Sequence, residues 1–227
     1  MPKSYTSRQN GIRIVMKKLL LSVLALGFVF AVSAQGEIRW GVKAGANLSN
    51  ITSKSDGNKV DESNARFGFH FGGVMEYSFS PKFAFQPELL IVVNGANPED
   101  AELILGPPMD RVLVSNQFIR ITQIQIPINL KYKTGTDAMK FFVTAGPYIG
   151  YALSGKFGGK MDGASFDSDF YGGSNRRLDF GVGAGIGIEV SKITFGLNYQ
   201  YGIANLVDFD KYTRKMSSFL FSVGYFF

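Results

Sequence analysis

The sequence has 227 residues, enough for one domain of ordinary size with a substantial core. It contains no cysteine, which excludes disulfide bonds and thiolate metal sites. Of the 24 lysines and arginines, five lie in residues 1–34, which hold no acid, so the remaining 19 face 18 acids. The net charge of +6 therefore belongs to the N-terminal segment. The rest of the chain lacks the basic excess typical of nucleic-acid binding, and we expect no nucleic-acid partner.

The N-terminal segment is typical of a cleavable secretory signal. Two lysines precede a fourteen-residue apolar run (LLLSVLALGFVFAV), and the small residues VSA at its end fit a cleavage site. Fourteen residues are too few to span a bilayer comfortably as a helix. We predict a leader over residues 1–34, with a signal peptide at 16–34 cleaved after Ala34, and an exported mature domain over 35–227.

Eight segments of the mature chain alternate between apolar and polar residues, with the period of two of a β-strand. Short turns and long loops rich in Gly, Asn, Asp and Ser connect them in alternation, which is typical of a bacterial outer-membrane barrel. We therefore predict an all-β, eight-stranded, antiparallel, up-and-down transmembrane β-barrel. Its strands are expected at residues 40–50, 66–79, 82–94, 118–133, 140–154, 177–190, 192–204 and 216–227. The short turns are Ser80-Pro81, TGTDAM and Ser191, and the long loops are 51–65, 95–117, 155–176 and 205–215.

The two faces of each predicted strand differ in composition. The apolar rows of all eight strands contain one charged residue, Arg120, near a loop end. An eight-stranded barrel encloses room for small side chains or one small ligand, so the many Phe, Tyr, Leu and Ile side chains must face outward, toward lipid. A closed barrel also leaves no strand edge unpaired in the bilayer. The inward rows are then expected to hold Lys43, His70, Glu76, Glu88, Lys131, Asp179 and Glu189.

Outward aromatic residues gather near both ends of the predicted strands, as in the aromatic girdles of membrane barrels. A general preference of aromatic residues for strands does not explain this clustering. We predict a multi-pass protein of the bacterial outer membrane, with the short turns in the periplasm. The turn-side girdle holds Trp40, Tyr77, Phe79, Phe83, Phe85, Tyr132, Phe141, Phe195, Tyr225 and Phe227, and the loop-side girdle holds Phe67, Phe69, Phe118, Tyr151, Phe180 and Phe219.

The stretch DFGVGAGIGIEV (179–190) contains glycine at every second position. A dinucleotide-binding loop requires G-x-G-x-x-G, and the residue three after Gly183 is Ile186. The stretch is therefore predicted as a strand whose glycines face the lumen and make room for Phe142 and Tyr148. Glu189 is expected to form a salt bridge at its end.

Several segments resemble the PorT-like outer-membrane β-barrel family of the Bacteroidetes, and the closing FSVGYFF resembles the C-terminal signature read by the outer-membrane assembly machinery. The resemblance implies a barrel over the whole mature chain and this machinery as a partner during biogenesis. Most members of the family have no assigned activity, and its name-giving member belongs to a protein-secretion and gliding system. The resemblance also predicts Pro87, Pro127 and Pro147 inside strands, at bulges or irregular pairings. The segments are WGVKAGANLSN (40–50), FQPELL (85–90), IQIPINLKY (124–132), FFVTAGPYIGYALSGK (141–156) and DFGVGAGIGIEV (179–190).

His70 is the single histidine and the first candidate for chemistry. It could act as the general base of a hydrolase or acyltransferase, which requires a nucleophile and an orienting acid within hydrogen-bond reach. Glu76 on the same strand lies roughly 20 Å away at about 3.3 Å per residue, and no G-x-S-x-G motif occurs. A hydrogen-bonded filler of the lumen is the favoured interpretation, so we expect no catalytic residue.

The inward charges Lys43, Glu76, Glu88, Lys131 and Glu189 lie in the turn-side half of their strands. They could form a charged constriction that selects ions in a pore. The alternative is a salt-bridged plug, because buried charges must be paired. The narrow lumen of eight strands favours the plug.

The long loops are the expected binding surface, since a rigid scaffold places function on its loops. Asp162, Asp167 and Asp169 lie in one of them without the spacing of an EF-hand calcium site, and we expect neither a metal nor a cofactor. The predicted function is a non-enzymatic structural, interaction or transport- and secretion-associated role that presents four surface loops. The alternatives are a small-solute porin and a lipid-modifying enzyme. The expected partners are the bilayer, the assembly machinery and proteins that contact the loops.

Overall fold

The computed structural model describes residues 36–55, 58–105, 110–136, 138–171, 175–207 and 212–227. The predicted leader and signal peptide lie outside these described residues. Residues 37–227 form one compact unit. In the described part of the chain, no helix is long and apolar enough to cross a membrane.

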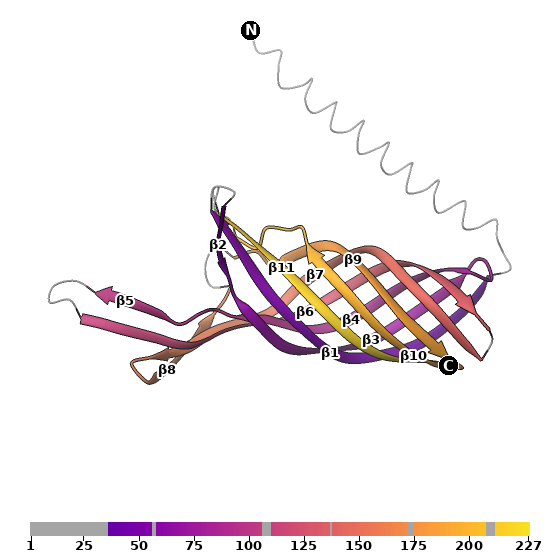
Figure 1. Ribbon diagram of the computed structural model, residues 1–227, viewed down its shortest axis with the longest axis horizontal. Coiled ribbons are helices and arrows are strands. Elements are labelled where there is room, and N and C mark those ends of the chain that lie inside the picture. The colour runs from indigo at the N-terminus through magenta and orange to yellow at the C-terminus, as the bar shows by residue number, and fades with distance from the viewer. Residues whose placement is uncertain (1–35, 56–57, 106–109, 137, 172–174, 208–211) are drawn as a thin grey trace, which may run out of the picture. The chain divides into compact units, whose positions relative to one another are not determined.

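One antiparallel sheet contains all eleven strands, and eight of them close into a ring (Figure 1). Around the ring the order is β1, β3, β4, β6, β7, β9, β10 and β11, and β11 pairs back with β1 from Gly41 opposite Phe226 to Ser55 opposite Tyr212. Each ring strand pairs with the next one along the chain, which confirms the predicted eight-stranded up-and-down barrel. The strands are β1 (Glu37–Ser55), β2 (Asn58–Glu62), β3 (Asn64–Ser78), β4 (Phe83–Asn97), β5 (Ala101–Leu105), β6 (Asp110–Gly135), β7 (Met139–Met161), β8 (Ala164–Asp169), β9 (Leu178–Val190), β10 (Ile193–Gly202) and β11 (Tyr212–Phe226).

On the loop side, several strands continue where the sequence predicted loops. The segments 51–65, 95–117 and 155–176 are largely strand, and β2, β5 and β8 pair with β1, β6 and β7. The chain turns between β7 and β8 at Asp162 and Gly163, whose positive φ angles of 46° and 85° suit a two-residue hairpin turn. The prediction of loops was wrong here because a strand such as β8, which is exposed on both faces, has no buried row to give it alternating polarity.

The short turns lie at the opposite end of the ring. The predicted one-residue turn at Ser191 is wrong, since Ser191 and Lys192 both lie between β9 and β10, and Ser191 has a φ of 55°. The turn between β3 and β4 spans residues 79–82, and its Ser80 Oγ accepts the N–H of Phe83 at 2.9 Å. A two-residue hairpin turn needs a positive φ to match the twist of its strands. The alternation of apolar and polar residues does not show where a positive φ occurs, so it does not fix the length of the turn.

The three strand prolines interrupt the ladder without shifting it. Pairing of β4 with β6 stops after Pro87 and resumes at Leu90. Pairing of β6 with β7 stops after Pro127 and resumes at Leu130, and Pro147 faces this interruption from β7. The register is the same on both sides of each gap, so these are irregular pairings and not bulges. Proline has no N–H to donate, which explains the gaps.

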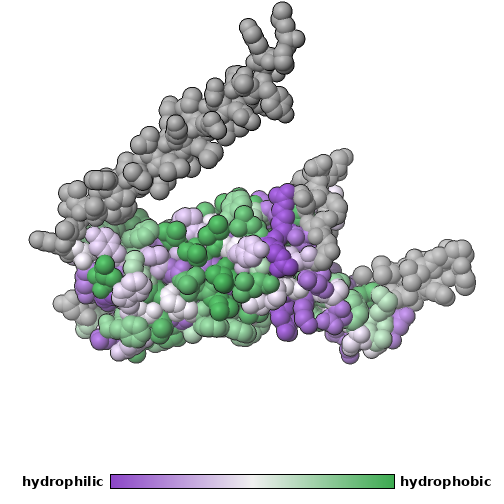
Figure 2. Space-filling model, turned by 180° about the vertical axis from the view of Figure 1, so that it is seen from behind, coloured by the Kyte–Doolittle hydropathy of each residue, from purple (hydrophilic) through white to green (hydrophobic). Residues whose placement is uncertain are grey.

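The outward and inward rows have the polarity that the sequence predicted. Outward Phe67 is 70% exposed and outward Ile186 is 60% exposed, whereas inward His70 is 1% exposed. Hydrophobic residues cover the body of the barrel in Figure 2, and a collar of hydrophilic residues follows where the strands leave it on the loop side. An apolar face of this kind belongs in lipid and not in water.

The glycine row of β9 faces the lumen, as predicted. A Cβ atom added to Gly187 would overlap the ring of Phe142, and one added to Gly181 would lie 2.7 Å from Cε1 of Tyr148. Both aromatic side chains come from β7, which pairs directly with β9. The missing side chains therefore make room for two rings inside a narrow barrel.

Substitution of Gly187 by alanine is expected to destabilise the barrel by about 1–3 kcal/mol, because the new methyl group overpacks the lumen against Phe142. Gly73→Ala is the matched control, since a Cβ at Gly73 meets nothing within 4 Å. Urea unfolding in lipid vesicles, followed by the fluorescence of Trp40, measures both. Equal stability of the two variants would contradict this account of the glycine row.

Candidate functional site

The side chains inside the ring form three layers between the turn side and the loop side. The turn-side layer is charged, the middle layer is polar, and the loop-side layer is apolar. Each layer is made by strands from several parts of the chain, so the lumen is the place where distant segments meet. The layers decide whether a solute can pass.

Glu76 on β3 is the centre of the charged layer and is fully buried. Its carboxylate accepts hydrogen bonds from Arg39 at 2.6 Å, from Lys131 at 2.7 Å and from Lys133 at 2.6 Å. Charge-assisted hydrogen bonds of this length are the strong class. One carboxylate thus joins β1, β3 and β6.

A second carboxylate, Glu189 on β9, extends the charged layer across the lumen. Arg39 Nη1 lies 2.8 Å from Glu189 Oε1, and Lys131 Nζ lies 3.4 Å from Glu189 Oε2. Arg39 also lies over the ring of Phe226 at 4.5 Å, and Lys131 lies over the ring of Phe142 at 4.3 Å. The predicted role of Glu189 as a salt-bridge partner is confirmed.

Next to this cluster, Lys43 Nζ and Glu88 Oε2 form an ion pair at 2.8 Å. All five charges expected for a salt-bridged plug are therefore paired. Two further members, Arg39 and Lys133, were missed. The predicted first strand began one residue too late to include Arg39, although a period of two counted back from Lys43 places it inward.

Little space remains between these side chains. The cavity bordered by Lys43, Glu88, Lys131 and Phe142 has a volume of about 30 Å³. This is room for about one water molecule. The charged layer is therefore a packed plug at this level of the lumen.

The middle layer consists of neutral hydrogen-bonded pairs and one acid. The side-chain amides of Gln125 and Gln200 exchange two hydrogen bonds of 3.1 Å, and Tyr148 donates its hydroxyl to Asp179 at 3.2 Å. The glutamine pair crosses the lumen from β6 to β10, and the Tyr148–Asp179 pair joins the neighbouring strands β7 and β9. They satisfy polar groups that have little access to water.

His70 lies in the same layer, and its Nε2 is 2.9 Å from Oγ of Ser222 on β11. A hydroxyl thus lies within reach of the histidine, which the sequence analysis did not find because the partner is 152 residues away. Both residues are buried, at 1% and 7% exposure. Among the described residues, Nδ1 of His70 has no hydrogen-bond partner, so an orienting acid is missing. The pair joins β3 to β11 within the lumen.

The loop-side layer is apolar, which the sequence analysis did not anticipate. Its core is made by Ile51, Ala96, Ile119, Ile121, Ala152, Phe170, Leu206 and Met216. Phe170 and Leu206 come from segments between strands and lie in the mouth of the ring. Tyr171 packs against this layer, and burial raises the pKa of its hydroxyl above the usual range, so it stays neutral. The lumen is therefore closed a second time.

Above the apolar layer, a cavity of about 650 Å³ opens between the loop-side segments. Its floor includes Ile51, Ile119 and Phe170, and its walls carry polar and charged groups.

The three aspartates of the segment 155–176 act separately. Asp162 Oδ1 accepts the N–H of Leu113, Asp167 pairs with Lys156 at 3.2 Å, and Asp169 Oδ1 accepts the N–H of Tyr171. The part of the chain that the structure describes contains no group of three or more acids or histidines placed to hold a metal ion.

The sequence was also compared with known proteins. The model of the family described as outer membrane protein beta-barrel domain matches residues 30–208, well over half of the chain. The chain belongs to this family. No curated protein matches it.

Solved structures similar to this family member include OprG of Pseudomonas aeruginosa, with 13% identity, a TM-score of 0.46 and coverage of 85% of this chain and 97% of that one. The attachment invasion locus protein Ail of Yersinia pestis has 14% identity and a TM-score of 0.41, over 84% and 99% of the two chains. The outer membrane enzyme PagL has 10% identity and a TM-score of 0.32, over 79% and 98%. Similarities this low do not transfer a function.

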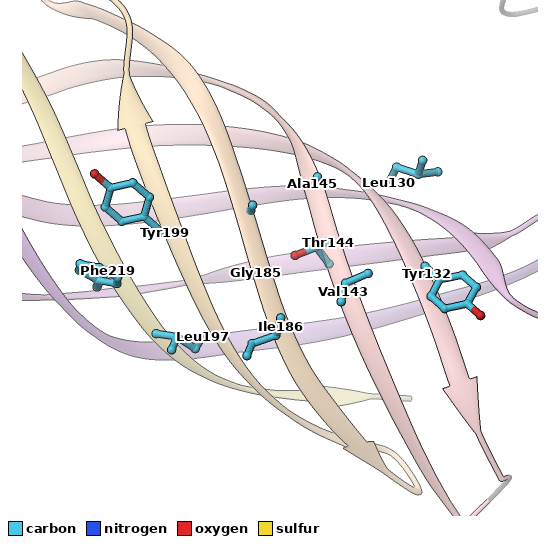
Figure 3. Close-up of a pocket in the computed structure, with 11 residues that line it drawn as sticks. Leu130, Tyr132, Val143, Thr144, Ala145, Gly185, Ile186, Leu197, Tyr199 and Phe219 are labelled. Carbon is cyan, nitrogen blue, oxygen red and sulfur yellow. The ribbon is translucent and has the colours of Figure 1, made fainter.

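The outward face of this outer membrane barrel carries a depression, shown in Figure 3. Its volume is about 570 Å³, and its floor is the cross-strand pair Ala145 and Ala184. Tyr199 and Phe219 stand on one side and Leu130 on the other (Figure 3). The lining contains no charged residue, so this groove suits hydrocarbon chains of the surrounding lipid.

Substitution of Glu76 by glutamine is expected to destabilise this barrel by about 3–5 kcal/mol, because it leaves buried Lys133 without its counter-charge and Lys131 with only the longer contact to Glu189. Asp167→Asn is the control, since the exposed pair of Asp167 and Lys156 is worth less than about 1 kcal/mol. Urea unfolding in lipid vesicles compares the two. A Glu76→Gln barrel as stable as Asp167→Asn would show that the plug contributes little to stability.

Proposed function

We propose that this chain is a multi-pass outer-membrane barrel that neither conducts solutes nor catalyses a reaction, and that acts through the surface on its loop side. The observation that carries the proposal is the double closure of the lumen, by the charged layer around Glu76 and by the apolar layer around Ile119 and Phe170. An eight-stranded ring has little interior space even without such layers.

The proposed orientation places the short turns in the periplasm and the loop-side strands outside the cell. The predicted export signal supports it, because an exported chain starts from the periplasm. The lengths of the connections support it too, since outer-membrane barrels have short periplasmic turns and longer extracellular segments.

The loop-side sheet is the proposed contact with partner proteins. β5, β6, β7 and β8 form a four-stranded extension of the barrel wall, visible in Figure 1 as the part that projects beyond the ring. Among the described strands, β5 and β8 each pair on one side only, so they leave backbone groups available to another chain. The resemblance to the PorT-like family supports a role in a secretion assembly of the cell envelope.

The purified barrel is expected to show no ion conductance in planar lipid bilayers, because both layers block the lumen. Step-like currents would contradict this and favour the porin alternative. In that case, charge reversal at Glu88 or Lys131 would change the selectivity of the current, since both side chains line the lumen.

The lipid-modifying alternative depends on His70 and Ser222. Cells that express the wild-type protein and the His70→Ala variant are expected to contain the same lipids, because the pair is buried in the lumen and has no access to lipid. Mass spectrometry of outer-membrane lipids makes the comparison. A modified lipid that disappears in His70→Ala would establish the enzyme instead.

A further inference from the structure

The cavity at the loop-side mouth of the ring ends blindly. Its volume of about 650 Å³ lies in the range of small-molecule sites. Its floor residues Ile51, Ile119 and Phe170 are each more than nine-tenths buried and belong to the apolar layer that closes the lumen. A solute that enters from the loop side therefore stops on an apolar floor.

The walls of this cavity are held by hydrogen bonds. Asn175 Nδ2 donates to the carbonyl of Phe170 at 2.6 Å, and Gln117 Nε2 donates to the carbonyl of Glu99 at 2.7 Å. Ser63, between β2 and β3, donates its hydroxyl to the carbonyl of Ile51 on β1 at 2.8 Å. A site formed in advance loses less entropy when a ligand binds.

The charges around the cavity are unequal. Among the described residues, Glu99, Asp100 and Asp169 line it together with one base, Arg214. The acids belong to the segment after β4 and to the end of β8, which pairs with β7, whereas Arg214 lies on β11, on a different side of the ring. The excess of carboxylates favours a positively charged ligand.

Two of these acids each accept a backbone hydrogen bond with one carboxylate oxygen. Asp100 Oδ1 accepts the N–H of Asn116 at 2.8 Å, and Asp169 Oδ1 accepts the N–H of Tyr171 at 2.8 Å. These bonds fix the carboxylates in place. Both bonds use Oδ1, so Oδ2 is the atom of each carboxylate that an ammonium group would contact.

We propose that the cavity binds a small amphipathic organic cation. Its apolar body packs on Ile119, Phe157 and Phe170, and its ammonium group contacts the carboxylates of Asp100 and Asp169. The aromatic rings of Phe157 and Phe170 suit such a ligand, because a ring face also attracts a cation. This inference rests on the proposed function, since the closed lumen is what makes the cavity a binding site.

Equilibrium dialysis tests the proposal with the exported chain in phosphatidylcholine nanodiscs. The probes are tryptammonium, its anionic analogue indole-3-propionate and the neutral indole-3-propionamide, which have similar apolar bodies. Empty nanodiscs measure the uptake of each probe by lipid. We expect tryptammonium to bind the protein about ten-fold more tightly than the anion, with the neutral probe between them.

Charge variants locate the site. Asp100→Asn and Asp169→Asn keep an amide oxygen for the backbone hydrogen bond, and each is expected to weaken tryptammonium binding about two- to five-fold, as for other exposed ion pairs. Arg214→Gln removes the repelling base and is expected to strengthen binding about two-fold. The matched control is Asp167→Asn, which changes an exposed acid on β8 that does not line the cavity and is expected to leave binding unchanged.

Three results would overturn the proposal: no binding beyond that of empty nanodiscs, tighter binding of the anion, or an equal effect of Asp167→Asn and Asp169→Asn. Heat-modifiable migration on gels confirms that each variant is a folded barrel. The planar-bilayer recording separates the two proposals. Ion currents together with tryptammonium binding would contradict only the closed lumen. The absence of both current and binding would contradict only this site.

Discussion

The structure depends on the pairing of its first ring strand with its last. Hydrocarbon offers no hydrogen bonds to the backbone, so a sheet inside a bilayer is stable only when it has no open edge. The ladder from Gly41 opposite Phe226 to Ser55 opposite Tyr212 removes that edge. With eight strands this closure also fixes a narrow interior, and the arrangement of the lumen follows from its width.

A narrow interior restricts the size of every inward side chain and requires a partner for every inward polar group. On β9, Gly181 and Gly187 have no side chains, which makes room for Tyr148 and Phe142 of β7. Polar groups that point inward must find partners, and the charges around Glu76 and the amides of Gln125 and Gln200 do so across the lumen. On the loop side, the strands no longer alternate between an apolar outward row and a polar inward row. The cavity above the apolar layer opens at this end of the ring.

The sequence predicts the barrel well because lipid sorts side chains by the simplest rule, with charged groups on one parity of each strand. The same rule explains the failures. Strand β8 is exposed on both faces, so its segment resembles a loop. Ser222 meets His70 only because the ring closes, and no local pattern encodes a contact across 152 residues. The apolar layer was missed because Phe170 and Leu206, which complete it, lie between strands, where no period of two places a side chain.

The charged layer also bears on how the barrel assembles. Its members come from β1, β3, β6 and β9, so no contiguous half of the chain contains all of them. A partly built barrel without β3 leaves Lys133 without the carboxylate of Glu76, and one without β1 leaves Glu88 without Lys43, which costs several kcal/mol. The electrostatics of the lumen therefore favour the complete ring over such intermediates.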